Sequence, residues 1–303
     1  MIYTVTFNPS LDYYVNVKNL KIGTVNRADS QRIAAGGKGL NVSLALKELG
    51  RDSLALGFVA GFTGNYICEK ATECGLNHEF IEVTGQNRIN VKIKSGSQTD
   101  INGTGAEINF SDVDKLIKKL NELLKEGDWL IVSGSVPPTL DNTAYANLLD
   151  KLKCVDGVNI VIDSHGELLI ETLKHKPFLI KPNIHEICGV FGLKSAPDTE
   201  GVFAYARKLQ QLGARNVIVS MGASGAAMVT EKQQAVFVRA ARGEAVNAVG
   251  AGDSLIAGFI HEFINTGDYI SALKYAVAAG SACAFTENFA SIEQIEQVKN
   301  LMP

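Results

Sequence analysis

The chain has 303 residues, of which 46% are hydrophobic and 20% charged, and its formal net charge is -3 at pH 7. This composition is ordinary for a soluble globular protein, and since no Lys/Arg cluster stands out, it argues against a nucleic-acid or membrane partner. The five cysteines are scattered without a C-x-x-C spacing, which predicts free thiols, no zinc site and a cytoplasmic location.

Strand-like and helix-like segments alternate along most of the chain, which predicts an α/β fold: a doubly wound, mostly parallel sheet with helices on both faces. We expect one domain over residues 1–303. The strands are predicted, from apolar runs between turn residues, at 2–7, 13–17, 27–34, 53–58, 78–83, 89–95, 98–102, 129–133, 159–163, 178–181, 216–221, 226–230 and 235–239. The helices are predicted, from periodicity and end signals, from 35–41 to Gly50, at 65–74, from a cap at 111–114 to about Gly127, and at 142–153, 167–173, 185–191, 199–212, 255–265, 269–285 and 292–301.

Two segments break the alternation, because 13–34 and 89–102 contain strands without helices. We expect them to pair as a small separate sheet, a β lid over the core formed by about 11–34 and 87–104. A sheet of this size buries little by itself and leaves open edges. A second copy would cover it, which predicts a homodimer through the lid.

Polar residues or glycines follow nearly every predicted strand of the main sheet. Ligands of open parallel sheets bind beyond the carboxyl ends of the strands, so a shared site is expected there. The residues at these ends are Asn8, Gly57, 133–135, 163–164, 181–183 and 220–222.

The segment 247–254 places glycines and an acid at the start of a predicted helix. Gly250, Ala251 and Gly252 form a backbone cradle for an anion, since the first amides of a helix lack internal partners. Asp253 at the rim is suited to deprotonating an attacking hydroxyl. The same residues also fit a tight turn with Asp253 as a mere N-cap. No G-x-x-x-x-G-K-[ST] and no G-x-G-x-x-G is present, which excludes a P-loop and a dinucleotide fingerprint.

A second glycine run, 36–39, contains Lys38 and also enters a helix, which predicts another anion site, for a phosphorylated or acidic substrate. Asp12 and Asn41 suit sugar hydroxyls, and the forked guanidinium of Arg88 suits a phosphate. Taken singly, Asp12 and Arg88 also fit solvated surface charges.

The hexapeptide 181–186 joins a strand to a helix. Lys181 could meet a nucleotide phosphate, and Asn183 and Glu186 could hold the water shell of Mg²⁺. The alternative is an N-cap with a first-turn acid. Likewise 220–225, with its glycines, fits a plain hairpin as well as a nucleotide contact.

These motifs resemble the ribokinase-like (PfkB) carbohydrate kinases. Residues 247–254 match the second signature of the family, 36–41 the first, and Asn183-x-x-Glu186 the magnesium-associated motif, over nearly the whole chain from Thr6 onward. Residues 8–10 and 133–138 look like the hexose-phosphate branch. Within it, 88–92 and 99–102 look most like 1-phosphofructokinases, with tagatose-6-phosphate kinases close behind and 6-phosphofructokinases next.

The resemblance implies ATP and Mg²⁺ as cofactors and assigns residues to three roles. The catalytic group comprises the base Asp253 and the anion hole Gly250, Ala251 and Gly252. Nucleotide contacts are implied for Lys181, Asn183, Ser220, Gly222, Gly225, Gly250 and Gly252, and magnesium contacts through water for Glu186 and Asn183. Substrate contacts are implied for Asp12, Gly37, Lys38, Asn41, Arg88 and Asn90. Two positions depart from the family pattern, Ala248 for threonine and His165 for serine.

The expected activity is ATP-dependent phosphorylation of a ketohexose monophosphate to the bisphosphate, most like a 1-phosphofructokinase. A kinase of an unphosphorylated sugar or nucleoside is less consistent with Lys38 and Arg88. A non-enzymatic sugar-phosphate sensor is disfavoured because Asp253 and its glycines are intact. With an ordinary pKa near 3.9, Asp253 would be fully ionised at neutral pH.

Overall fold

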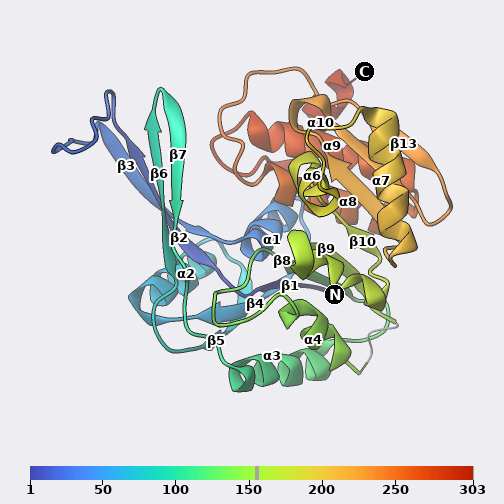
Figure 1. Ribbon diagram of the computed structural model, residues 1–303, viewed down its shortest axis with the longest axis horizontal. Helices are drawn as coiled ribbons and strands as arrows, with labels where there is room; N and C mark the ends of the chain where they lie inside the picture. The colour runs from blue at the N-terminus through green and yellow to red at the C-terminus, as the bar shows by residue number, and fades with distance from the viewer. Residues whose placement is uncertain (154–156, 303) are drawn as a thin grey trace.

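The computed structural model of the protein describes residues 1–153 and 157–302. Its main sheet has nine strands in the order β13-β12-β11-β10-β9-β8-β1-β4-β5, all running in one direction except β12, which pairs antiparallel with both β11 and β13 (Figure 1). This confirms the predicted mostly parallel sheet. The strands are β1 (Ile2–Thr6), β4 (Leu54–Val59), β5 (Asn77–Glu82), β8 (Trp129–Ser133), β9 (Asn159–Asp163), β10 (Leu179–Ile180), β11 (Asn216–Ser220), β12 (Ala226–Val229) and β13 (Ala235–Val238).

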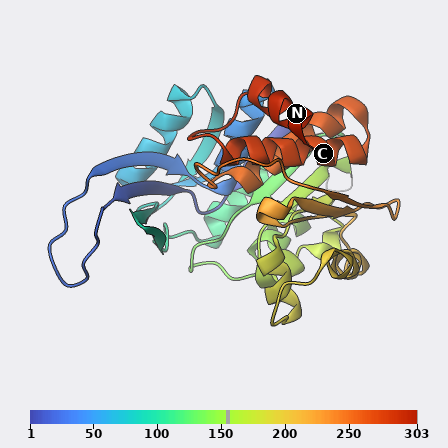
Figure 2. The same ribbon diagram turned by 90° about the horizontal axis from the view of Figure 1, so that it is seen from above.

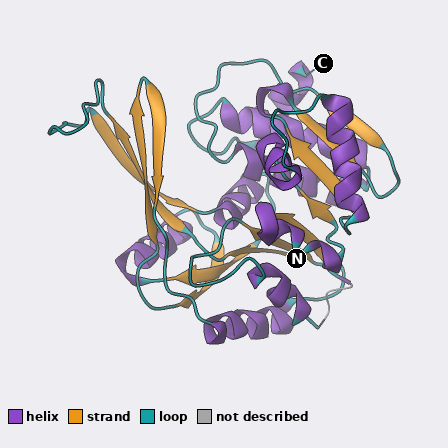
Figure 3. Cartoon of the chain, viewed as in Figure 1, coloured by secondary structure: helices purple, strands orange, loops and turns teal. Residues whose placement is uncertain are grey.

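Helices cover both faces of this sheet, as predicted (Figure 3). Successive side chains of β8 point to opposite faces of the sheet, and both sets are apolar, so each face needs a cover of helices. Leu130 and Val132 belong to the core under α3, α4, α6 and α7, whereas Trp129 and Ile131 belong to the core under α1, α8, α9 and α10. The helices are α1 (Lys38–Glu48), α2 (Gly61–Glu73), α3 (Phe110–Leu123), α4 (Ala144–Asp150), α5 (Gly166–Ile170), α6 (Ile184–Phe191), α7 (Thr199–Gln211), α8 (Ala251–Thr266), α9 (Tyr269–Ala284) and α10 (Ile292–Leu301). None of the helices in the described part of the chain is long and apolar enough to cross a bilayer.

The predicted separate sheet is also confirmed. Four strands, in the order β3-β2-β6-β7, project from the body of the molecule (Figures 1 and 2). Strands β2 and β6 pair in parallel at the centre, and each has an antiparallel partner at the edge. We call it the lid sheet; its strands are β2 (Ser10–Asn16), β3 (Ser30–Gly36), β6 (Arg88–Ser95) and β7 (Ser97–Asn102).

The two faces of the lid sheet differ because side chains alternate along each strand. The face toward the body carries mainly polar and charged residues, whereas the outer face is mostly apolar. Three of the outer residues, Ile33, Ile89 and Ile101, are 48%, 41% and 58% exposed. The outer face comprises the apolar Leu11, Val15, Ile33, Ala35, Ile89, Val91, Ile93 and Ile101 together with Tyr13, Gln31 and Thr99.

Some predicted boundaries were wrong, for local reasons. Helix α3 is capped by Asn109, whose side chain accepts from the amide of Asp112, so the cap precedes the predicted 111–114. The helix ends at Leu123, before the predicted end near Gly127. Helix α8 begins at Ala251, four residues before its predicted start, which places Asp253 inside the first turn. Of the cysteines, Cys68, Cys74, Cys188 and Cys283 are free as predicted, and Cys154 lies outside the described residues.

Candidate active site

The anion cradle is formed by the first turn of α8. Gly250 is its N-cap with φ 86°, a left-handed conformation that favours glycine, and no side chain caps the helix. A Cβ on Gly250 would lie 2.8 Å from the Phe289 ring. The open N-terminus therefore presents backbone amides, and the helix dipole, to the space in front of it. Asp253 is not the N-cap, so that alternative was wrong.

Asp253 is almost buried, 6% exposed, and its Oδ2 accepts a hydrogen bond of 2.8 Å from Asn41 Nδ2 of α1. Burial, and after it the charge of Asp163, raises the pKa of Asp253 to about 6, although Lys38, Asn41 and Lys181 oppose the rise. The expectation of an ordinary pKa was therefore wrong. The carboxylate is still mostly ionised at pH 7, but it is a stronger base than an exposed aspartate.

Two lysines converge on one acid beside Asp253. Lys38, the first residue of α1, places Nζ 3.1 Å from Asp163 Oδ1, and Lys181, just after β10, places Nζ 3.3 Å from the same oxygen. Lys181 Nζ also lies 3.4 Å from the position that a Cβ on Gly252 would take. The fold thus holds both predicted phosphate-binding lysines on Asp163, with Lys181 beside the anion cradle at Gly252 and Lys38 at the start of α1. The sequence identified Asp163, which ends β9, only as one of the polar residues at strand ends and did not predict its contact with the two lysines.

The predicted sugar-side residues gather where the lid sheet joins the body. Asp12 Oδ1 accepts from Ser10 Oγ and from Asn90 Nδ2, both at 2.8 Å, and Asp12 is only 7% exposed. Its interpretation as a solvated charge was therefore wrong. Arg88 Nε donates to the backbone oxygen of Asn8 at 3.1 Å, and burial lowers the pKa of its guanidinium.

A cavity of about 600 Å³ opens between the lid sheet and α1, and Asp12 and Asn41 line it. Gly37, the N-cap of α1, has φ 129° and would place a Cβ 3.2 Å from Pro9 Cα, so the chain turns tightly into this helix. Asp12 and Asn41 thus share one cavity, with Asn41 linked directly to Asp253.

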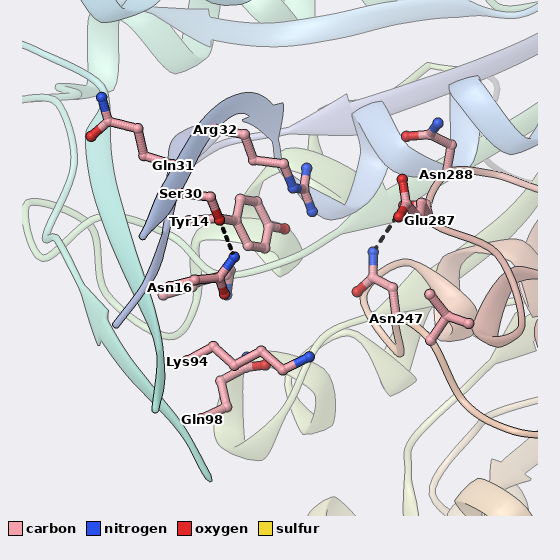
Figure 4. Close-up of a pocket in the computed structure, with 12 residues that line it drawn as sticks. Tyr14, Asn16, Ser30, Gln31, Arg32, Lys94, Gln98, Asn247, Glu287 and Asn288 are labelled. Atoms are coloured by element: carbon pink, nitrogen blue, oxygen red, sulfur yellow. Dashed lines mark hydrogen bonds between the residues drawn. The ribbon is translucent and has the colours of Figure 1, made fainter. Parts of the chain in front are cut away.

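The inner face of the lid sheet adds residues that the sequence patterns did not reveal. Tyr14 and Arg32 line both the first cavity and a neighbouring one of about 450 Å³, and the guanidinium of Arg32 lies 3.6 Å from the Tyr14 ring centre (Figure 4). Across the gap, Asn247 donates to the backbone oxygen of Glu287. Tyr14 follows Asp12 by two residues on one strand, so alternation from Asp12 could have identified it.

On the other side of the cradle lies a mostly apolar slot of about 290 Å³. Ser220, Gly222 and Gly225, all predicted to face ATP, line it together with Leu255 and Phe285. The hairpin interpretation of 220–225 is confirmed, because β11 and β12 pair antiparallel across it, and the nucleotide contact stays a prediction. Gly225 has φ 114° and would place a Cβ 2.0 Å from the Val238 oxygen, so only glycine fits there.

Asn183 and Glu186 form a reciprocal capping box at the start of α6, as the alternative interpretation predicted. Asn183 Oδ1 accepts from the amide of Glu186 at 2.9 Å, and Glu186 Oε2 accepts from the amide of Asn183 at 2.8 Å. The charge of Glu186 also acts on the lysine cluster, since it helps to raise the pKa of Lys38 against the lowering by burial. Among the described residues no group of three His, Cys, Asp or Glu side chains could enclose a metal. Oxygen donors without such a cage fit a hydrated Mg²⁺.

The two departures from the family pattern lie at different places. Ala248 lines the apolar slot, and its backbone oxygen accepts from the amide of Ala251 at 3.3 Å. His165 is the exposed N-cap of α5. Neither replaces a side chain of the cluster around Asp253.

Residues 6–294 match the model of the pfkB family of carbohydrate kinases. The chain is 41% identical to a 1-phosphofructokinase of Bacillus subtilis, covering 98% of this chain and 97% of that protein. It is 33% identical to a tagatose-6-phosphate kinase of Staphylococcus epidermidis, covering 98% of this chain and all of that protein. The solved tetrameric inhibited form of phosphofructokinase-2 from Escherichia coli is similar in structure, with a TM-score of 0.90 at 25% identity and coverage of 99% and 98%.

Proposed function

The chain belongs to the pfkB family of carbohydrate kinases, and on that premise we propose that it phosphorylates fructose 1-phosphate with ATP to fructose 1,6-bisphosphate. The observation that carries this proposal is the position of Asp253. Residues 247 and 249 line the cavity under the lid sheet, whereas residues 248, 251 and 252 line the apolar slot. The base thus lies where a sugar and a nucleotide would meet.

The chain's own groups account for the transfer. Asp253 accepts the proton of the attacking hydroxymethyl group, and Asn41 orients its carboxylate. The amides of Gly250 and Gly252 at the start of α8 would stabilise the charge on the transferred phosphoryl group without reorganisation, and the amide of Ala251 between them, which donates to the Ala248 oxygen at 3.3 Å, could contribute only as a shared donor. Lys181, beside Gly252, neutralises nucleotide phosphates.

Magnesium would be held through water by Glu186, with Asn183 beside it. When bound, it would supply charge neutralisation of the ATP phosphates. The capping box keeps the Glu186 carboxylate at the start of α6, where its charge acts on Lys38.

The sugar phosphate would bind under the lid sheet. Asp12, held by Ser10 and Asn90, accepts from sugar hydroxyls, while Lys38 and Arg88 bind the phosphate that the substrate already carries. Gly37 belongs to this site because its tight turn brings the start of α1 close to β1. The 41% identity to a 1-phosphofructokinase supports fructose 1-phosphate ahead of tagatose 6-phosphate.

The test is the release of ADP from ATP in the presence of single sugar phosphates. Fructose 1-phosphate should give the highest kcat/KM, ahead of tagatose 6-phosphate and fructose 6-phosphate, and unphosphorylated fructose should be poor. A preference for tagatose 6-phosphate would select the second candidate. No ADP release with any of the three would favour a sugar-phosphate sensor and reject the kinase.

We propose further that the protein forms a homodimer through the lid sheet. The apolar outer face, with exposed Ile33, Ile89 and Ile101, supports this, because a second copy would cover that surface. The relative from Escherichia coli is described as tetrameric in an inhibited form. We also propose that residues 1–303 form one domain, with residues 11–34 and 87–104 as its lid, and that it acts in the cytoplasm.

A further inference from the structure

The most enclosed charge in the molecule's central cluster belongs to Asp163, at the carboxyl end of β9. Its side chain has no exposed surface, and it ion-pairs with two lysines through one oxygen, Oδ1. The other oxygen, Oδ2, is buried without a hydrogen-bond partner. A carboxylate buried in this way cannot reach a substrate, so its role must pass through its neighbours.

Those neighbours come from opposite sides of the site. Lys38 begins α1, the helix that borders the cavity under the lid sheet, and its side chain is 35% exposed. Lys181 follows β10, is 5% exposed at the side chain, and touches the cradle at Gly252. Both ammonium groups bind Asp163 Oδ1. This one oxygen atom therefore fixes the distance between Lys38 on the sugar side and Lys181 on the nucleotide side.

The charges agree with this arrangement. Burial alone would raise the pKa of Asp163, but Lys181 and Lys38 lower it overall, so the group stays ionised. Burial would likewise lower the pKa of Lys38, but Asp163 and then Asp253 raise it. The cluster therefore contains two carboxyl groups and two lysine ammonium groups, so its net charge is close to zero.

We propose that Asp163 is a positioning residue of the phosphoryl-transfer site, which holds Lys38 and Lys181 in register and opposes their charge at Asp253. The inference rests on the proposed function for its kinetic part only. Among the described residues, the charged and titratable groups that act on Asp253 come from different elements: Asp163 at β9, Lys38 at α1, Lys181 after β10 and Cys283 in α9.

The kinetic test is the pH profile of kcat for Asp163→Asn with fructose 1-phosphate. The variant loses a negative charge beside the base while both lysines remain. In the wild type, kcat should fall below about pH 6 as Asp253 becomes protonated, and we call this part of the profile the acid limb. In the variant the acid limb should move down by about 1–3 pH units, which is the usual effect of one nearby charge on a pKa. We also expect kcat at pH 7.5 to fall by about 10–100-fold, because the lysines lose their anchor. A lower kcat with an unmoved limb would mean a structural role and overturn the proposal.

Two further variants separate charge from position. Asp163→Glu retains the carboxylate but displaces it by one methylene, so the limb should stay near pH 6 while kcat falls. Should the asparagine variant fail to fold, a glutamate variant with wild-type kcat would still contradict the positioning role. Asp128→Asn is the matched control, since Asp128 is 8% exposed and ion-pairs with the Met1 amino group at 2.6 Å, far from the site. It should leave the limb in place.

A second measurement needs no substrate. The pH at which the difference in denaturant midpoint between wild type and Asp253→Asn stops growing and levels off reports the protonation of Asp253 in the folded protein. In an Asp163→Asn background this pH should move down by the same 1–3 units. If the wild type releases no ADP but this shift occurs, the proposed function fails and the positioning inference survives. If the wild type is active and neither pH shift occurs, only the inference is wrong.

Discussion

Replacing Asp253 by asparagine should stabilise the protein at neutral pH although it removes the catalytic base. Folding raises the pKa of this carboxyl from an ordinary 3.8 to about 6, chiefly through burial and next through Asp163. Since one pKa unit corresponds to about 1.4 kcal/mol, the ionised side chain costs the folded state on the order of 3 kcal/mol. Asparagine mimics the neutral acid and can still accept from Asn41.

The stability difference between the variant and the wild type should change with pH in a defined direction. A raised pKa means that the folded wild type binds this proton more tightly than the unfolded chain does. The wild type therefore loses stability relative to the variant as pH rises from about 4 to about 6, and the difference stays constant above that. We expect the variant to be more stable by about 3 kcal/mol at pH 8, by about half as much at pH 5, and by nothing below pH 4.

Urea denaturation at fixed ionic strength, from pH 5 to pH 8, measures this directly through the shift in midpoint. Asp163→Asn is the matched comparison within the same cluster. Its pKa is lowered by Lys181 and Lys38 against burial, so neutralising it should destabilise the fold by about 3–5 kcal/mol at pH 7. An Asp253→Asn variant that is less stable than wild type at pH 8, or a gain that persists unchanged to pH 5, would refute the reasoning.

Further outcomes follow from the same site. Asp253→Asn should lower kcat by about 10²–10⁴-fold in a stopped ADP-release assay, and retention of half the turnover would exclude a base there. Arg88→Ala should lower kcat/KM for fructose 1-phosphate by about 10–150-fold with little change in the KM for ATP. An equal fall in kcat/KM for unphosphorylated fructose would mean that Arg88 only anchors the lid at Asn8. Gly225→Ala should cost about 2 kcal/mol or more in thermal unfolding, since its Cβ would overlap the Val238 oxygen, and a wild-type Tm would contradict this. Val91→Glu, on the outer lid face, should give a monomer mass by light scattering, whereas an unchanged mass would reject that interface.

Sequence patterns predicted the main sheet well because its strands are buried on both faces. Strands β8 and β9 have the predicted bounds, since both are short apolar runs ended by polar residues. Helix starts were harder to locate. The first turn of α8 contains two glycines and no side-chain cap, so propensity alone placed its start at Leu255. The cap at Asn109 was missed because a second cluster of capping residues follows it at once.

The predicted site residues mostly converge, because strand ends of one sheet share an edge. What the sequence could not supply is the interaction of residues far apart in the chain. Lys38 and Asp163 are 125 positions apart, and nothing local marks them as partners. Likewise the raised pKa of Asp253 results from burial and from the charge of Asp163 at the end of β9, neither of which a short motif encodes.

The cluster also resolves a conflict inherent in phosphoryl transfer. Cations are needed near the reacting phosphates, but cations beside an aspartate lower its pKa and weaken it as a proton acceptor. Here Lys38 and Lys181 act on Asp253 in that direction, and burial with Asp163 outweighs them. With a pKa of about 6 the base is about nine-tenths ionised at pH 7, yet it binds a proton far more readily than an ordinary aspartate. A site can keep both its phosphate-binding charges and an effective base when a second, enclosed carboxylate opposes the lysines. Asp163 provides that carboxylate without reaching the substrates, because none of its side chain is exposed.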